Sequence, residues 1–190
     1  MEAQPDITRL IVEWQQGNRE AESALFEQLY QRLHTIAAHL TRAEATENSM
    51  GATALIHEAY MRFCGTTQLK IVNRSHFLAL AARVMRRILV DRARARKAAK
   101  RNASDESTGP SAWFRDEAEV DEVIAVDRAL DVLRTRSPRQ CRLVELRYFG
   151  GYTIEESAVV LDISPRHARR EWDVARIRLR EAIDGVAATQ

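Results

Sequence analysis

Hydrophobic residues recur along this chain at the spacing of amphipathic helices. In the first segment Ile7, Leu10, Ile11 and Trp14 follow the i, i+3, i+4, i+7 rule, and Gly17 marks the expected end of the helix. Stripes of the same period predict further helices over residues 25–40, 55–63 and 77–90, and again from residue 120 onward. No segment shows the sustained alternation of a β-strand, so the pattern predicts an all-α fold.

The predicted helices fall into two groups, separated by residues 102–119. This segment is rich in Ser, Gly, Pro and acidic residues, which is typical of an interdomain linker. We therefore expect two small helical domains, at residues 6–101 and 120–186. Trp113 and Phe114 interrupt the linker and are candidates to dock on one of these domains.

Composition excludes some classes of protein. No apolar run approaches the ~20 residues of a membrane span, and the opening MEAQPDITRL lacks the basic start and apolar stretch of a signal peptide. Cys64 and Cys141 have no CxxC partner, which favours two buried core thiols in a reduced, cytoplasmic protein. The formal net charge is only +2, so any basic surface must come from local clustering.

The C-terminal pair of predicted helices has the helix-turn-helix pattern. Thr153 and Glu156 have the spacing of a capping box, and Ser164-Pro165 opens a second helix soon afterwards. On a helical wheel, one side of that second helix is apolar. It comprises Ala168, Trp172, Ala175, Leu179 and Ile183. The opposite side carries arginines suited to guanine and phosphate, which favours a DNA-reading helix over a merely solvated one. These are Arg166, Arg169, Arg170, Arg176 and Arg180.

A second basic helix precedes the linker. The stretch 83–101 holds nine Lys or Arg and one acid, Asp91, whereas a solvated helix face usually mixes both signs. The wheel places Arg83, Arg86, Arg87, Arg94 and Lys97 away from the apolar side of this helix. Such crowding is relieved when a polyanion meets it. The preceding residues 73–77 bring an amide, a hydroxyl and rings to the helix start, where Ser75 is a candidate cap and an unstacked base could bind.

Taken together, these segments resemble a bacterial sigma factor of the sigma-70 family, of the extracytoplasmic-function (ECF) type and its ECF-like subgroup. The resemblance covers residues 8–185. TALIHEAYMRF (53–63) is similar to the helix that binds the clamp helices of core RNA polymerase, and the segment 75–101 to the helix that meets the minus-ten element. GGYTIEESAVVLDISPRHARREWDVARIRL (150–179) is similar to the minus-thirty-five helix-turn-helix.

The resemblance implies a role for individual residues. Those expected to bind core polymerase are Leu55, Ile56, Glu58, Tyr60 and Arg62. Those expected at the melted minus-ten strand are Asn73, Arg74, Ser75, His76, Phe77, Arg83, Arg86, Arg87 and Arg94. Those expected in the groove of the minus-thirty-five element are Arg166, His167, Arg169 and Arg170, with Arg176 on a phosphate. The implied partners are core RNA polymerase (clamp helices and flap region), promoter DNA in duplex and single-stranded form, and an anti-sigma factor. The implied location is the bacterial cytoplasm, at the nucleoid.

The chain departs from the family pattern at three places. Thr53-Ala54 stands where many members carry an acid before the clamp motif, and Arg87 stands where an Asn is common. The recognition helix opens with the bulky, basic RHARREW instead of small residues followed by Val and Lys. These differences leave the polymerase contacts and the promoter sequence open.

The sequence leaves two alternative functions open. A two-domain helix-turn-helix regulator that acts without polymerase, or a sigma-like interaction adaptor, would share these features. An enzyme is disfavoured, because His57-Glu58 is not followed by a His at zinc-protease spacing and no catalytic residue, metal site or cofactor motif stands out. The linker acids suggest one further hypothesis, that they fold against the basic helix and inhibit it. They are Asp105, Glu106, Asp116, Glu117 and Glu119.

Overall fold

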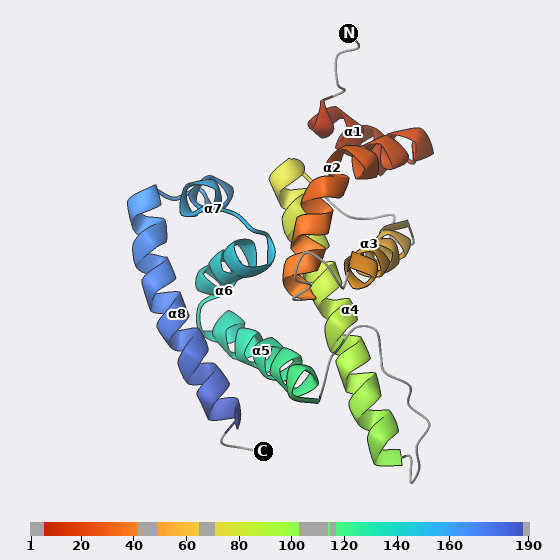
Figure 1. The fold of residues 1–190 in the computed structure, drawn as a ribbon. Helices are drawn as coiled ribbons and strands as arrows, with labels where there is room; N and C mark the ends of the chain where they lie inside the picture. Colours follow the sequence, from red (N-terminus) through yellow and green to blue (C-terminus); the bar gives the residue numbers. More distant parts are fainter. Residues whose placement is uncertain (1–5, 42–48, 65–70, 103–113, 115–116, 188–190) are drawn as a thin grey trace. The chain divides into compact units, whose positions relative to one another are not determined.

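The computed structural model describes residues 6–41, 49–64, 71–102, 114 and 117–187 (Figure 1). Every regular element in these ranges is a helix, which confirms the all-α prediction. Within the described ranges, no helix is long and apolar enough to cross a membrane.

By its internal contacts the chain divides into two units, residues 1–85 and residues 86–190. The division falls inside α4 (Arg74–Asn102), before the predicted linker at 102–119. Most of that linker lies outside the described residues, Trp113 among them. Phe114 is buried, and its carbonyl accepts a hydrogen bond from Arg96 Nη1 at 3.2 Å. The functional boundaries at 101 and 120 stay a prediction.

The first unit contains α1 (Ile7–Gln15), α2 (Arg19–Leu40), α3 (Ser49–Cys64) and the first turns of α4. Short polar side chains set the helix starts: Asp6 caps α1 by accepting from the Thr8 N–H at 3.0 Å, and Asn18 caps α2. Gly17 lies between them at φ +91°, a conformation that L side chains rarely adopt. The predicted end of the first helix is therefore confirmed.

An aromatic cluster fills the core of the first unit. The Phe77 ring lies 5.5 Å from Phe26, 5.6 Å from Phe63 and 5.9 Å from Trp14, measured between ring centroids. Most of these rings meet edge to face, an arrangement that aromatic quadrupoles favour. The leucine stripe of α2 is buried beside α1 and α3, as the periodicity predicted.

The second unit contains the last part of α4, then α5 (Glu117–Arg136), α6 (Pro138–Val144), η1 (Glu145–Phe149), α7 (Ile154–Leu161) and α8 (Pro165–Ala187). Helix α8 runs along α5, α6 and α7 (Figure 1). The short segment η1 is a π-helical turn that continues α6. Helix α6 and η1 together form one helical segment from Pro138 to Phe149, with a wider last turn.

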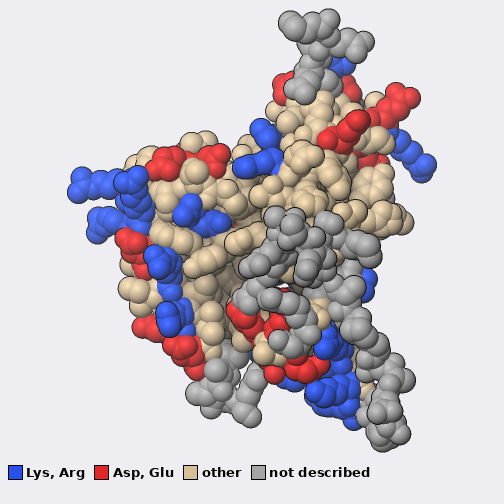
Figure 2. Space-filling model, in the orientation of Figure 1, with Lys and Arg blue, Asp and Glu red and all other residues tan. Residues whose placement is uncertain are grey.

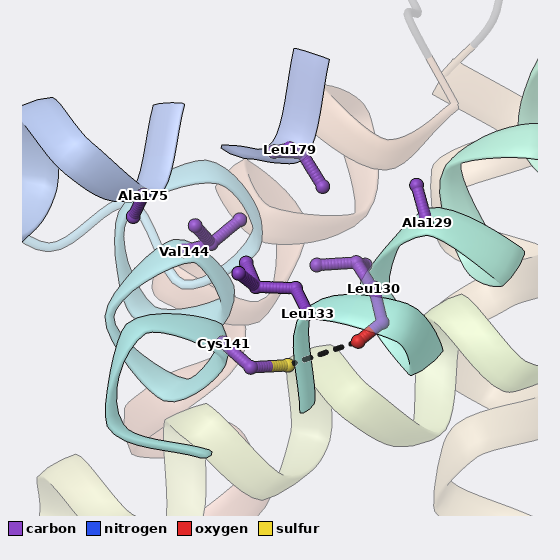
Figure 3. Packing of buried hydrophobic residues seen from close by; sticks show 7 residues of the cluster. All are labelled: Ala129, Leu130, Leu133, Cys141, Val144, Ala175 and Leu179. Atoms are coloured by element: carbon purple, nitrogen blue, oxygen red, sulfur yellow. Dashed lines mark hydrogen bonds between the residues drawn. The ribbon is translucent and has the colours of Figure 1, made fainter. Parts of the chain in front are cut away.

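Small and branched apolar side chains make the core of this unit (Figure 3). Leu130 and Leu133 of α5 meet Val144 of α6 and Ala175 of α8. The Cys141 thiol is buried among them and donates to the Leu130 carbonyl at 3.5 Å. Burial, helped by the Glu145 charge, raises the pKa of Cys141 to about 11. The prediction of a buried core thiol is confirmed for Cys141, whereas the Cys64 side chain lies outside the description.

The starts of α4 and α6 are capped in different ways. Asn73, not Ser75, caps α4, because the Asn73 Oδ1 accepts from the His76 N–H at 2.9 Å and the helix begins at Arg74. Ser137 does occupy the cap of α6 before Pro138, but its side chain makes no capping hydrogen bond. At α4, two short polar residues lie near the helix start, and Asn73 is the one that caps it. At α6, Pro138 occupies the first helical position, where its fixed φ favours the helix without a side-chain cap.

Candidate nucleic-acid interface

Helices α7 and α8 form a helix-turn-helix with both starts capped. The Thr153 Oγ1 accepts from the Glu156 N–H at 3.1 Å, and a Glu156 carboxylate oxygen accepts from the Thr153 N–H at 2.8 Å. This is the predicted capping box. Asp162, at φ +53°, ends α7 in a left-handed turn, and the Ser164 Oγ then accepts from the His167 N–H at 3.2 Å to start α8.

The capping box has a measurable effect on stability. Thr153→Ala removes one acceptor and should lower the free energy of unfolding by about 1 kcal/mol. Thr135→Ala on α5 is the matched control, because the Thr135 hydroxyl only donates to a carbonyl one turn back and is exposed. Urea unfolding of both variants, followed by circular dichroism, measures the difference. Equal stability of the two variants would show that the box contributes nothing.

Side-chain contacts fix α8 in place on its inner side. The Arg147 guanidinium lies over the Trp172 ring at 5.0 Å, and the Tyr148 ring lies 5.3 Å from the same ring. Arg147 also donates to the Tyr152 carbonyl at 2.8 Å. Arg178 donates to the Gln140 side chain at 2.9 Å. The helix is therefore held by its inner face, and its outer face is left to solvent.

The outer face of α8 carries the predicted basic side chains. All of them are exposed, and Figure 2 shows Lys and Arg gathered over the end of α8 that begins at Pro165. They are Arg166, His167, Arg169, Arg170 and Arg176. A surface hollow of about 380 Å³ lies among them, lined by Ser164, Arg166, His167, Arg170, Glu171 and Val174. The positive end of the α8 helix dipole adds to the attraction for anions there.

The arginines of this face are not equivalent. Arg169 Nη2 donates to a Glu155 carboxylate oxygen of α7 at 2.8 Å. The backbone N–H of Glu155 itself, and then Arg169, hold the pKa of that carboxyl below its ordinary value. Arg169 thus has a local partner, whereas Arg166 and Arg170 line the hollow together. The structure separates side chains that the wheel had grouped.

Val174 lies one turn beyond Arg170 and lines the same hollow. It is 41% exposed, and Ile177 after it is 62% exposed. The sequence analysis missed both residues, because it considered only the apolar residues on the packed side of α8. Their i+4 and i+7 spacing from Arg170 was the available signal.

The start of α4 holds the predicted minus-ten loop residues in mixed environments. Asn73 and Arg74 are exposed, Ser75 and His76 are half-buried, and Phe77 is fully buried in the aromatic cluster. The Val72 N–H donates to His76 Nδ1 at 3.4 Å. The Gln15 side chain of α1 bonds both the N–H and the carbonyl of Ile71, which anchors the segment. Residues 65–70 lie outside the described part of the chain.

The arginines further along α4 divide into two sets. Arg83 and Arg87 are exposed. Arg86, expected beside them, is buried: its guanidinium lies 2.7 Å from an Asp127 oxygen and 3.4 Å from a Glu145 oxygen. This corrects the expectation from the helical wheel, which took every side chain on the polar arc to be exposed to solvent. In this arrangement Arg86 is covered by carboxylates of α5 and η1 and is not presented to DNA.

A family comparison decides between the classes of protein that share this geometry. The family model described as ECF sigma factor matches residues 4–185, nearly the whole chain. The chain belongs to the ECF sigma factor family. Comparison with curated proteins and with solved structures gives no match. The family resemblance deduced from the sequence is confirmed, and the sigma factor is a non-catalytic initiation factor that acts with RNA polymerase at specific promoters.

Helix α3 of the sigma factor carries the predicted polymerase-binding residues. Leu55 and Ile56 are buried, so they hold α3 in the first unit. The Tyr60 ring meets Phe26 edge to face at 4.7 Å and shares that structural role. Glu58 and Arg62 form an ion pair of 3.6 Å at the surface. The structure therefore splits the predicted set into fold residues and surface residues.

Met61 is a further surface residue of α3 that the sequence reasoning missed. It is 57% exposed between the clamp-motif residues Tyr60 and Arg62. Methionine is enriched at protein–protein interfaces relative to the rest of the surface, so Met61 is a candidate contact residue. Its place in the helix, one turn after the exposed His57, was the signal available.

Proposed function

We propose that this chain docks on core RNA polymerase through α3, reads the minus-thirty-five element with α8, and holds the melted minus-ten strand with the start of α4. The observation that carries the proposal is the exposed arginine face of α8. It opens the second helix of a capped helix-turn-helix, in a chain that the family model matches nearly from end to end. On the polymerase, the chain would contact the clamp helices and the flap. The protein would act in the bacterial cytoplasm, at the nucleoid.

The geometry of α8 supports a division of labour in the major groove. Arg166 and Arg170 lie one turn apart around the hollow and suit bidentate bonds to guanine. Val174, in line with them, suits apolar contact with a thymine methyl. Arg176 is exposed further along and suits a phosphate. His167 lines the same hollow, and its Nε2 lies 3.3 Å from a Glu171 carboxylate oxygen.

The start of α4 supports binding of a single strand. Asn73 and Arg74 are exposed at the helix N-terminus, where backbone N–H groups favour phosphate. Arg83 and Arg87 continue an exposed basic face along the helix. Phe77 contributes by holding the aromatic core, because its ring is not available to a base.

Binding to core RNA polymerase tests the proposal first. Glu58→Lys reverses one charge of the surface pair on α3 and should weaken binding at least about 10-fold, the loss expected when a charge reversal falls on an energetically important interface residue. Glu27→Lys is the control, because Glu27 is an exposed acid on the neighbouring helix α2 and undergoes the same change of charge. The measurement is a titration of purified core enzyme with labelled full-length protein.

The outcomes separate the alternatives. Tight binding that Glu58→Lys weakens and Glu27→Lys does not would support docking through α3. Equal effects of the two variants would move the contact elsewhere. No binding by the wild type, together with salt-dependent binding to duplex DNA, would instead favour a helix-turn-helix regulator that works without polymerase.

A further inference from the structure

The second half of α4 is a row of cations, and acidic side chains of the second unit meet them. The partners come from the first half of α5 and from η1, and all of these contacts lie within the second unit. The contacts are Arg86 with Asp127 and Glu145, Arg94 with Asp127, Arg96 and Lys100 with Glu117, and Lys97 with Asp121. Helix α4 is the helix that the proposed function assigns to minus-ten DNA.

Arg86 anchors the row. Its side chain is only 7% exposed, and its guanidinium bonds Asp127 at 2.7 Å and faces the Phe149 ring at 5.7 Å from the ring centroid. A buried guanidinium is tolerated only where carboxylates and hydrogen bonds replace its hydration. Asp127 and Glu145, themselves buried, supply part of that replacement, while the buried Arg86 Nε has no hydrogen-bond partner among the described residues. Glu145 is shared with Arg134, whose Nη2 lies 3.1 Å from the same carboxylate oxygen.

The other pairs lie nearer to solvent. Lys97 Nζ is 2.6 Å from Asp121, and both side chains are nearly half exposed. Arg96 Nη2 is 3.0 Å from Glu117. In Figure 2, acidic and basic side chains adjoin where the last turns of α4 pass the start of α5. Exposed pairs of this kind are weak and screened by salt, so another anion can replace the carboxylates.

We propose that the acidic face of the second unit, made of Glu117, Asp121, Asp127 and Glu145, is a docking site for the basic half of α4 and competes with promoter DNA for it. The inference rests on the proposed role of α4. A guanidinium that bonds a carboxylate in this way has fewer donors left for a phosphate. DNA must therefore displace the acids, beginning with the exposed pairs and ending with Arg86.

This assignment differs from the hypothesis drawn from the linker acids. Asp105, Glu106 and Asp116 lie outside the described residues, and Glu119 is buried. Of the members of that set that the structure describes, Glu117 pairs with Arg96 and Lys100 of α4. The other acids of the acidic face, Asp121, Asp127 and Glu145, lie further along the chain on α5 and η1.

The first test asks whether the contact forms in the free full-length protein. The chain has only three lysines, Lys70, Lys97 and Lys100. Zero-length carbodiimide coupling should therefore join Lys97 to Asp121 as the dominant crosslinked peptide pair, with Lys100 to Glu117 as a weaker one, both identified by mass spectrometry. Addition of excess single-stranded DNA should reduce the yield of the dominant pair several-fold.

The second test asks whether the contact competes with DNA. Glu117→Gln with Asp121→Asn removes two acids of the acidic face that are not buried. The control, Glu181→Gln with Asp184→Asn, makes the same two chemical changes at exposed positions near the end of α8. The first double variant should bind a fluorescent mixed-sequence single strand about 3- to 10-fold more tightly than the control, with a salt slope steeper by about 0.7 for each cation released.

Each result has a distinct meaning. Crosslinking that DNA suppresses, with tighter binding by the acidic-face variant alone, supports competition. An absent crosslink, or a crosslink that DNA leaves unchanged together with equal affinities, overturns it. A crosslink with no DNA binding by any variant refutes the proposed role of α4, and the competition falls with it, although the docking contact itself would stand.

Discussion

Replacing Arg166 and Arg170 together by alanine should weaken binding to the minus-thirty-five duplex at least about 30-fold. Each bidentate arginine–guanine pair discriminates by about 1–3 kcal/mol, so two lost pairs remove about 2–6 kcal/mol. Both side chains are exposed and line the same hollow, so their loss leaves the packed side of α8 intact. The effect should appear as lost base preference as well as lost affinity.

The affinity for duplex DNA is measured with the full chain bound to core RNA polymerase. The base preference is read from the duplexes that each variant selects from a randomised pool. Arg169→Ala is one control, because Arg169 already has Glu155 as a partner and should contribute less. Arg176→Ala is another. It should weaken all duplexes alike and reduce the salt slope by about 0.9, as expected for a phosphate contact. A double variant that keeps its base preference would place sequence reading on another part of the molecule.

Replacing Leu130 by alanine should lower the free energy of unfolding of the second unit by about 3–5 kcal/mol. Leu130 is fully buried in α5 and packs in the cluster with Leu133 and Val144 (Figure 3). Truncation removes apolar contact and leaves a cavity that a helical unit of this size cannot collapse without moving α8. The backbone carbonyl that accepts from Cys141 stays in place.

Urea unfolding with circular dichroism measures this loss. Val132→Ala is the control on the same helix, because Val132 is 37% exposed and its loss should change stability by less than about 1 kcal/mol. If Leu130→Ala also cost less than that, the cluster would not be the centre of the core.

Local signals predicted much of the fold from the sequence. The faces of α8 were predictable because a single helix sets them: Ala168, Ala175 and Leu179 are buried, and the arginines opposite are exposed. The capping box was predictable because its two partners lie three residues apart. The π-helical turn at Glu145–Phe149 had no such signal, since it adds one residue to a turn without changing the apolar pattern.

The environment of Arg86 was beyond local reasoning. A wheel shows which side chains share an arc, but not which part of the arc a later helix covers. Asp127 and Glu145 follow Arg86 by 41 and 59 residues, so the pairing depends on the tertiary fold. Phe77 and Leu55 differ from Arg86: the apolar periodicity already placed them on the packed sides of their helices, and their burial agrees with it, although the family resemblance assigned them to binding motifs.

The buried sulfur of Cys141 has a consequence for how this sigma factor responds to oxidants. With a pKa of about 11, only about 0.03% of this thiol is ionised near pH 7.5, and the thiolate is the form that oxidants and alkylating reagents attack. Cys141 is the one cysteine of residues 86–190. Cys141 should therefore react slowly with thiol reagents, so fluorescent or spin probes should label cysteines engineered on the exposed face of α8 in preference to the native thiol.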